Sequence, residues 1–243
     1  MTSPTTTDRD PPPYLLAALA GLVVLGIYIV TLAPTTAFWD TSEYIAAAYV
    51  LGIPHPPGNP LFVVLAHVWG AIPFAASYAV RINLFAAVTS AASAALWFLV
   101  ADRWMRNVVP ARWPRLAASF AGVLVSATVW TVWNQSTVNE KVYTVSMLST
   151  ALVMWLGVHW ADDDQGEHRD RYLILIAYVL ALSSTNHLMG VLAAPAVAVY
   201  VLATEPGMLL KPWVLWLAVT LGLAVSGKWT VLVSGEPAEQ AVV

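Results

Sequence analysis

The sequence predicts an all-α polytopic membrane protein with about seven transmembrane helices. Of its 243 residues, 59% are hydrophobic and only 10% are charged, whereas a soluble domain has about a quarter charged residues. Apolar stretches close to the length that crosses a bilayer recur along the chain. The composition excludes an ordinary soluble enzyme. With 11 Lys and Arg against 14 Asp and Glu, it also offers no basic surface to bind nucleic acid.

The apolar stretches follow a short polar tail, residues 1–13, which ends in three prolines and is expected to be disordered and cytoplasmic. The first stretch is too long for a signal-peptide core and lacks a basic cluster before it, so we interpret it as a retained helix. A short external tail, residues 234–243, is expected after the last stretch. The seven predicted spans are Tyr14–Ala33, Ile82–Ala101, Leu116–Trp133, Thr144–Ala161, Tyr172–Ser184, His187–Ala203 and Trp213–Val233.

Basic residues indicate the orientation of these helices, because cytoplasmic loops are enriched in Lys and Arg. Two short loops carry them, and we place both loops in the cytoplasm. The apolar stretch Leu61–Phe74 is too short to span, and a span there would move the first of these loops outside. We therefore predict one long external loop, Pro34–Val80, partly helical and lying on the membrane. The basic residues are Arg103, Arg106, Arg112 and Arg115 in one loop, and Arg169 and Arg171 in the other.

The external loop opens with two carboxylates, Asp40 and Glu43. One interpretation is a capped helix start, with Asp40 at the N-cap and Glu43 in the first turn. The other is a catalytic carboxylate that takes a proton from an acceptor hydroxyl. The two are compatible, since capping lowers a carboxylate pKa and keeps the group ionised. Two carboxylates alone are a weak indication of a divalent cation, so no metal site is assigned.

A rigid turn follows at residues 52–60, where four prolines and two glycines surround His55 and Asn59. A histidine in such a turn is either structural or, beside the acidic pair at the same interface, part of a substrate site. We take His55 and Asn59 as substrate-binding candidates.

These residues resemble a bacterial domain-of-unknown-function membrane family. It is related to the eukaryotic transmembrane O-mannosyltransferase that modifies plexin-type receptor domains, and belongs to the GT-C class of glycosyltransferases. The resemblance runs from about Tyr14 to about Pro195. It rests on Trp39-Asp40-x-x-Glu43, His55-Pro56-Pro57-Gly58-x-Pro60-Leu61-Phe62, Arg81-x-Asn83, Trp133-Asn134-Gln135-Ser136, Glu140-Lys141-Val142-Tyr143 and Ser184-Thr185-Asn186-His187.

The resemblance implies a GT-C-like fold in a bacterial cytoplasmic membrane and a polyprenyl-phosphate sugar as donor substrate. It also implies that Asp40 and Glu43 are the catalytic carboxylates, although Ser42 replaces the glycine of the family motif. The resemblance further implies that a second group binds substrate. These residues are His55, Asn59, Arg81, Glu140, Lys141, Asn186 and His187.

Two of these cations also have a purely structural interpretation. Arg81 can equally be an interfacial anchor whose side chain extends to the lipid headgroups. For Lys141, a solvent-exposed loop charge is the simpler prediction. Members of the family are generally longer than this chain, so a fragment is one expectation. A second functional hypothesis is therefore a non-catalytic GT-C-derived subunit that packs, among membrane lipids, against partner subunits of a larger membrane complex.

Overall fold

The computed structural model describes residues 11–37, 39–56, 58–75, 77–138, 141–163 and 169–212, and the secondary structure of these residues is entirely helical. Most of the predicted N-terminal tail, the seventh predicted span and the predicted external tail lie outside the described residues. The chain divides into two compact units, residues 1–197 and 198–243. The helices are α1 (Tyr14–Val30), α2 (Thr41–Val50), α3 (Pro60–Gly70), α4 (Tyr78–Met105), α5 (Arg112–Thr128), α6 (Trp130–Thr137), α7 (Val142–Asp162), α8 (Arg169–Ser184), η2 (Leu188–Val191), α9 (Ala193–Thr204) and η3 (Pro206–Leu210).

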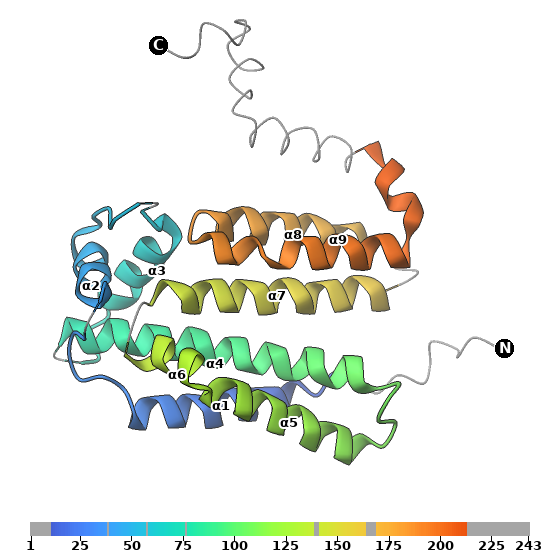
Figure 1. Cartoon of the computed structure of the whole chain (residues 1–243), viewed down its shortest axis with the longest axis horizontal. Coiled ribbons are helices and arrows are strands. Elements are labelled where there is room, and N and C mark those ends of the chain that lie inside the picture. Colours follow the sequence, from blue (N-terminus) through green and yellow to red (C-terminus); the bar gives the residue numbers. More distant parts are fainter. Residues whose placement is uncertain are drawn as a thin grey trace, which may run out of the picture. The chain divides into compact units, whose positions relative to one another are not determined.

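In the first unit, α4 is the central helix and packs against α1, α5 and α7, while α7 also packs against α8 (Figure 1). Small side chains allow these helices to approach closely. A Cβ atom on Gly21 of α1 would lie only 3.0 Å from the Ala91 carbonyl oxygen of α4. The main hydrophobic core lies between these helices and includes Ala20, Val24 and Phe98.

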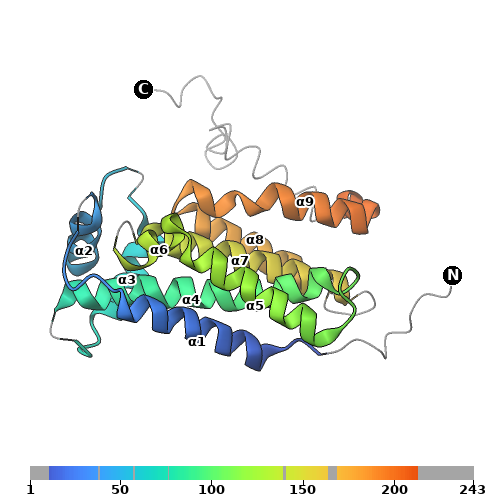
Figure 2. The ribbon, with the colours of Figure 1, turned by 60° about the horizontal axis from the view of Figure 1, so that its bottom comes forward.

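The pair α2 and α3 lies at one end of this bundle (Figures 1 and 2). A second core joins the pair to the first turns of α4 and α7, through residues such as Phe62, Ile82 and Val142. The two helices confirm that the predicted loop Pro34–Val80 is partly helical. The loop ends earlier than expected, since α4 already begins at Tyr78.

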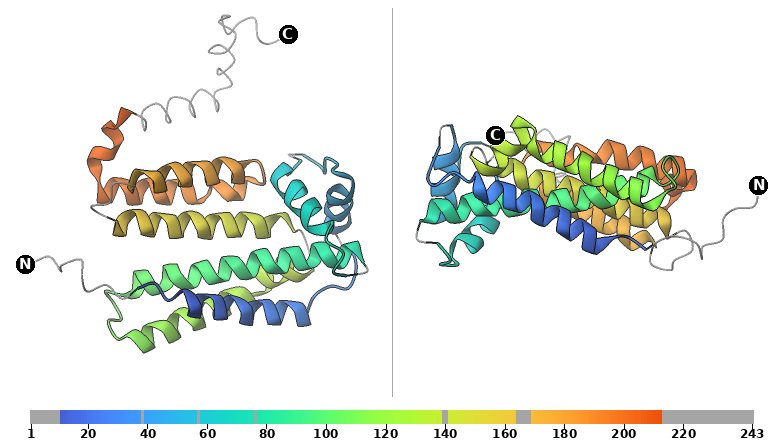
Figure 3. Two further views of the ribbon diagram at one scale, coloured as in Figure 1. Left: turned by 180° about the vertical axis from the view of Figure 1, so that it is seen from behind. Right: turned by 90° about the horizontal axis from the view of Figure 1, so that it is seen from below.

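The end of α4 and the start of α5, which carry arginines, lie at the opposite end of the bundle, as Figure 3 shows from behind. There Arg103 of α4 forms an ion pair with Asp162 of α7, with its Nε 2.8 Å from one carboxylate oxygen. The start of α1 is at the same end, because the Tyr14 hydroxyl lies 3.3 Å from Nε2 of His159. The α2–α3 pair and the basic connections are thus separated by the length of α4.

The predicted span Leu116–Trp133 is not one continuous helix, because the helix breaks at Val129. The axes of α5 and α6 meet at 67°, and Val129 has extended backbone angles instead of helical ones. At the break the hydroxyl of Tyr28 in α1 donates a 2.9 Å hydrogen bond to the carbonyl of Ala127. This bond satisfies a carbonyl group near the end of α5.

By length and composition, α4 and α7 can cross a membrane, and the bent pair α5–α6 adds a third span if counted as one. The other apolar helices of the described residues are shorter, namely α1, α3 and the stretch Leu188–Thr204. The described part of the chain therefore holds two to three candidate spans, and the count of seven is not confirmed.

Candidate functional site

Three side chains of the predicted site meet at the α2–α3 end of the bundle. Asp40 precedes α2, Glu43 lies in its first turn, and His55 lies in the proline turn before α3. One oxygen of Glu43 accepts the backbone N–H of His55 at 2.7 Å, and the other lies 2.8 Å from Nδ1 of its ring. On the far side of the ring, Nε2 lies 4.0 Å from a carboxylate oxygen of Asp40.

The histidine ring is therefore placed between two carboxylates. Because an ionised carboxylate only accepts hydrogen bonds, we assign a proton to Nδ1 on the side of Glu43. The Nε2 atom then faces Asp40, and a second proton on it would be attracted to that carboxylate. All three side chains are about 40% exposed, so solvent and a substrate can reach them. The arrangement places two carboxylates and an imidazole, which are groups that can accept or donate a proton, where solvent reaches them.

The expected capping of α2 by these carboxylates is not formed. Asp40 does occupy the N-cap position, but its side chain makes no capping hydrogen bond. The two oxygens of Glu43 instead accept hydrogen bonds from His55. The hydrogen bond from the His55 side chain, and then that from its backbone, lower the pKa of Glu43 below its usual value. The pKa of this carboxylate is thus lowered, as predicted, but the cause is the hydrogen bonds from His55 and not helix capping.

This pair should give the protein an acid-sensitive contact. Since the pKa of Glu43 is lower in the folded chain, the contact stabilises the fold above the ordinary glutamate pKa. We expect that stabilisation to be lost as the pH falls through the lowered value, because protonation removes the acceptor. Thermal unfolding of the wild type and of Glu43→Gln between pH 3 and pH 6 would measure it. Parallel pH curves for the two proteins would contradict the expectation.

Unusual backbone conformations are concentrated around the same site. Within the described residues, the non-glycine positions with positive φ are Trp39 (64°), Leu51 (51°) and Asn59 (43°), and Gly58 has φ 90°. Such conformations cost free energy in bulky residues and gather at functional sites. Here Trp39 precedes the acidic pair, Leu51 ends α2, and Gly58 and Asn59 lie between His55 and α3.

A buried polar network extends from this cluster into the bundle. The Tyr44 ring contacts that of His55, and its hydroxyl donates to Oδ1 of Asn59 at 3.2 Å. Asn59 donates in turn to the backbone carbonyl of Asn186. The Asn186 amide then donates to the Val142 carbonyl at 2.9 Å and to the Ser146 hydroxyl at 2.8 Å. The structure thus brings together Asn59 and Asn186, which are 127 residues apart.

Lys141 is the most unusual charge near this network. The simpler prediction of a solvent-exposed loop charge is wrong, because its side chain is 0% exposed. Its Nζ has no hydrogen-bond partner among the described residues. Burial lowers the pKa of Lys141 to about 7. Residues on either side of Lys141 are hydrogen-bonded to the site. The Val138 carbonyl accepts a hydrogen bond from the Thr41 hydroxyl, and the Val142 carbonyl accepts one from the Asn186 amide.

Two of the other candidates, Arg81 and His187, contact groups outside the cluster. The Arg81 guanidinium donates to the carbonyl of Gly70 and lies 5.3 Å from the ring centre of Tyr78, at the corner between α3 and α4. Nδ1 of His187 accepts the N–H of Met189 and caps η2. Glu140 lies outside the described residues. Roles for these three in substrate binding stay predictions.

The same cluster is where a cation could be held, because ligand atoms of Asp40, Glu43 and His55 lie within 4.8 Å of one another. Sequence reasoning missed the contribution of Tyr44 and Thr41, which connect the cluster to the bundle. Their position inside the acidic motif could have indicated this role, because a spacing of three residues places both on one face of a helix.

The fold and the site together define a class of protein. It is an all-helical, multi-pass membrane protein with a carboxylate–histidine cluster at one end of its bundle. The family model described as the protein O-mannosyl-transferase TMEM260 N-terminal domain matches residues 40–210. The match covers more than half of the chain and includes the whole cluster. The chain belongs to this family.

Two named relatives agree with this assignment. The protein O-mannosyl-transferase TMEM260 of Mus musculus is 28% identical over 209 residues, which cover 82% of this chain and 27% of the mouse protein. The protein O-mannosyl-transferase tmem260 of Dictyostelium discoideum is 26% identical over 134 residues, 54% of this chain and 15% of that protein. The chain thus spans about a quarter of the mouse relative. No solved structure matches it.

Proposed function

We propose that the chain is the catalytic membrane part of a GT-C-like glycosyltransferase. It would move a sugar from a polyprenyl-phosphate donor to an acceptor hydroxyl on the external face of the membrane. The observation that carries the proposal is the placement of Asp40 against a histidine that Glu43 holds by two hydrogen bonds. The names of the relatives support a mannosyl group as the sugar.

In this reaction Asp40 is the general base. The acceptor oxygen attacks the anomeric carbon and forms the new glycosidic bond, while its proton passes to the Asp40 carboxylate. The bond between the anomeric carbon and the phosphate oxygen breaks, its electron pair leaves with the phosphate, and the anomeric configuration is inverted. Glu43 acts through His55, because both of its oxygens are already engaged. We therefore assign Glu43 a positioning role.

The leaving phosphate needs a cationic partner, and Lys141 fits this need. A buried ammonium without a hydrogen-bond partner is costly, and an anionic ligand would relieve that cost. A phosphate would also favour the charged amine and raise the pKa of Lys141 again. Arg81 and a protonated His55 are further candidates for the same role.

The proposal includes the membrane arrangement expected from the sequence. In this arrangement the chain crosses a bacterial cytoplasmic membrane seven times and its N-terminus is cytoplasmic. The α2–α3 end lies on the external side and the basic connections lie on the cytoplasmic side. The separation of these two ends by the length of α4 supports it. A lipid-linked donor keeps its tail in the bilayer, so transfer at the membrane face suits the half-exposed cluster.

The test is transfer from a panel of radiolabelled polyprenyl-phosphate sugars by the purified chain, with Asp40→Asn as the inactive control. Transfer from one donor by the wild type alone would support the proposal and name the sugar. Failure of both proteins, each folded, to transfer any sugar would contradict the activity of this chain. It would favour the alternative of a non-catalytic subunit of a larger membrane complex.

We expect the transfer to proceed without a divalent cation. The hydrogen bonds from His55 already occupy one acceptor site on each oxygen of Glu43, so a metal at the cluster would compete with them for the carboxylate. Transfer measured in excess EDTA should therefore equal transfer without it. A loss that added Mn²⁺ or Mg²⁺ restores would instead assign the three ligand atoms to a cation.

A further inference from the structure

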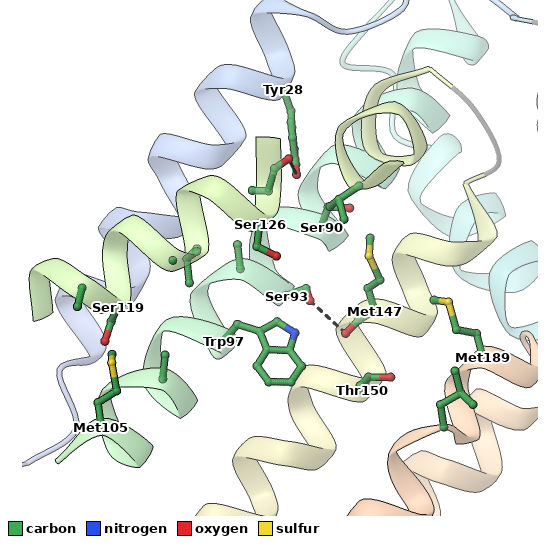
Figure 4. Close-up of a pocket in the computed structure, with 18 residues that line it drawn as sticks. Tyr28, Ser90, Ser93, Trp97, Met105, Ser119, Ser126, Met147, Thr150 and Met189 are labelled. Carbon is green, nitrogen blue, oxygen red and sulfur yellow. Dashed lines mark hydrogen bonds between the residues drawn. The ribbon is translucent and has the colours of Figure 1, made fainter. Parts of the chain in front are cut away.

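A large cavity lies inside the first unit, away from the carboxylate–histidine cluster (Figure 4). Its volume of about 530 Å³ is within the range of ligand sites in proteins. On α4 its lining runs from Ser90 to Met105, a distance of about 22 Å along the helix axis. Figure 4 shows Trp97 of α4 between its two ends, with Met147 of α7 and Met189 of η2 on the opposite wall.

The lining is mostly apolar and favours an apolar occupant. Hydroxyl groups do line the cavity, but those of Tyr28, Ser93 and Ser119 donate to the carbonyls of Ala127, Met147 and Arg115. These protons are therefore not offered to a ligand. The three methionines Met105, Met147 and Met189 add flexible apolar surface that adapts to a chain of variable shape.

The cavity also opens sideways between helices. Its lining includes Ala118, Gly122 and Ser126, which are exposed on α5 at intervals of one turn. Because α4 and α7 are candidate membrane spans, this opening faces the depth at which lipid chains lie. A hydrocarbon chain could enter from the side without passing through water.

Two arginines share one carboxylate beside the end of the cavity at Met105. The buried carboxylate of Asp102 is shared by two arginines, at 2.8 Å from Nε of Arg115 and 3.4 Å from the guanidinium of Arg106. The Nε atom of Arg106 is buried without a hydrogen-bond partner. Arg112, one or two turns before the cavity on α5, is exposed.

Exposed tryptophans accompany these arginines. Trp104 is 51% and Trp113 is 73% exposed, as is typical of side chains at the level of lipid headgroups. Basic groups between helices at this level attract anionic lipids.

We propose that the cavity binds one acyl chain of an anionic glycerophospholipid whose phosphate lies against Arg106 and Arg112. The inference does not rest on the proposed transfer reaction. This lipid would be a bound structural lipid and not a substrate, and the carboxylate–histidine cluster lies at the end of the bundle opposite Arg106 and Arg112. The chain fills the space between α4, α5 and α7, and the headgroup balances the second arginine at Asp102.

Gly122→Leu provides the direct test. A Cβ atom added at Gly122 meets nothing within 4 Å, so a larger side chain can be introduced at this position of the cavity lining. Gly26→Leu is the matched control, because Gly26 of α1 also has open space around it and does not line the cavity. Native mass spectrometry of the purified chain would count bound phosphatidylglycerol and, separately, phosphatidylcholine with the same acyl chains.

We expect the wild type and Gly26→Leu to retain one phosphatidylglycerol, and Gly122→Leu to retain roughly tenfold less. Arg112→Gln should reduce the preference for phosphatidylglycerol over phosphatidylcholine by roughly fivefold, while the chain still binds. Equal retention by Gly122→Leu and Gly26→Leu, with both folded by circular dichroism, would overturn the proposal. It would also be overturned if undecaprenyl phosphate replaced the phospholipid, because the occupant would then be a polyisoprenoid.

Discussion

Asp40→Asn is expected to abolish sugar transfer while leaving the fold intact. Asparagine has nearly the same shape but cannot accept the acceptor proton, and loss of a general base lowers rates by roughly 100-fold to 10,000-fold. The side chain makes no capping hydrogen bond and is about 44% exposed, so its replacement removes little packing. The rate of transfer from the active donor, with the thermal unfolding midpoint of the same sample, measures both effects.

A control for this change is Asp163→Asn. Asp163 follows α7 at the other end of the bundle, so the same substitution there should leave transfer unchanged. Glu43→Gln should fall between the two, since it weakens the hold on His55 and leaves Asp40 in place. Equal rates for Asp40→Asn and the wild type would remove Asp40 from the mechanism, even if the cluster remains a binding site.

Lys141→Met is expected to stabilise the protein and to weaken transfer. Methionine has a similar length and removes a buried amine that has no partner in the described residues. Because the folded-state pKa of Lys141 is lowered to about 7, the unfolded chain binds the proton more tightly. We expect a gain of roughly 2–4 kcal/mol at pH 7.

The pH dependence separates this effect from ordinary packing. The destabilisation by Lys141 is complete below pH 7 and shrinks as the pH rises from about 7 toward the ordinary lysine pKa. The difference between Lys141→Met and the wild type in thermal unfolding should therefore be smaller at pH 9 than at pH 7. A variant that is more stable but transfers sugar at the wild-type rate would exclude Lys141 from phosphate binding.

Much of the fold could be predicted from hydrophobic runs. The helices predicted as Ile82–Ala101 and Thr144–Ala161 are present and somewhat longer, as Tyr78–Met105 and Val142–Asp162. Run length could not show the break at Val129, because the apolar stretch continues through it. Charged residues suggest the end of a span, but Arg103 and Asp162 lie within the two helices, where they pair with one another.

The site was predicted in part for the same physical reason. Asp40, Glu43 and His55 are close in sequence and the proline turn limits where His55 can lie, so their proximity was predictable. The contact of Asn59 with Asn186 depends on how α3 and η2 pack, which no local pattern records. Burial of Lys141 is likewise a tertiary property, and a polar sequence context suggested the opposite.

The break between α5 and α6 has a consequence for how the chain assembles during insertion. A bilayer offers no water to a carbonyl released by a helix break, so such a group must find a partner within the protein. For Ala127 that partner is the phenol of Tyr28, which belongs to α1, a helix that is synthesised before α5 and α6. The Ala127 carbonyl at the bend therefore gains this hydrogen bond only after α1 has packed against α5. The bent shape of α5–α6 thus depends on α1 being in place.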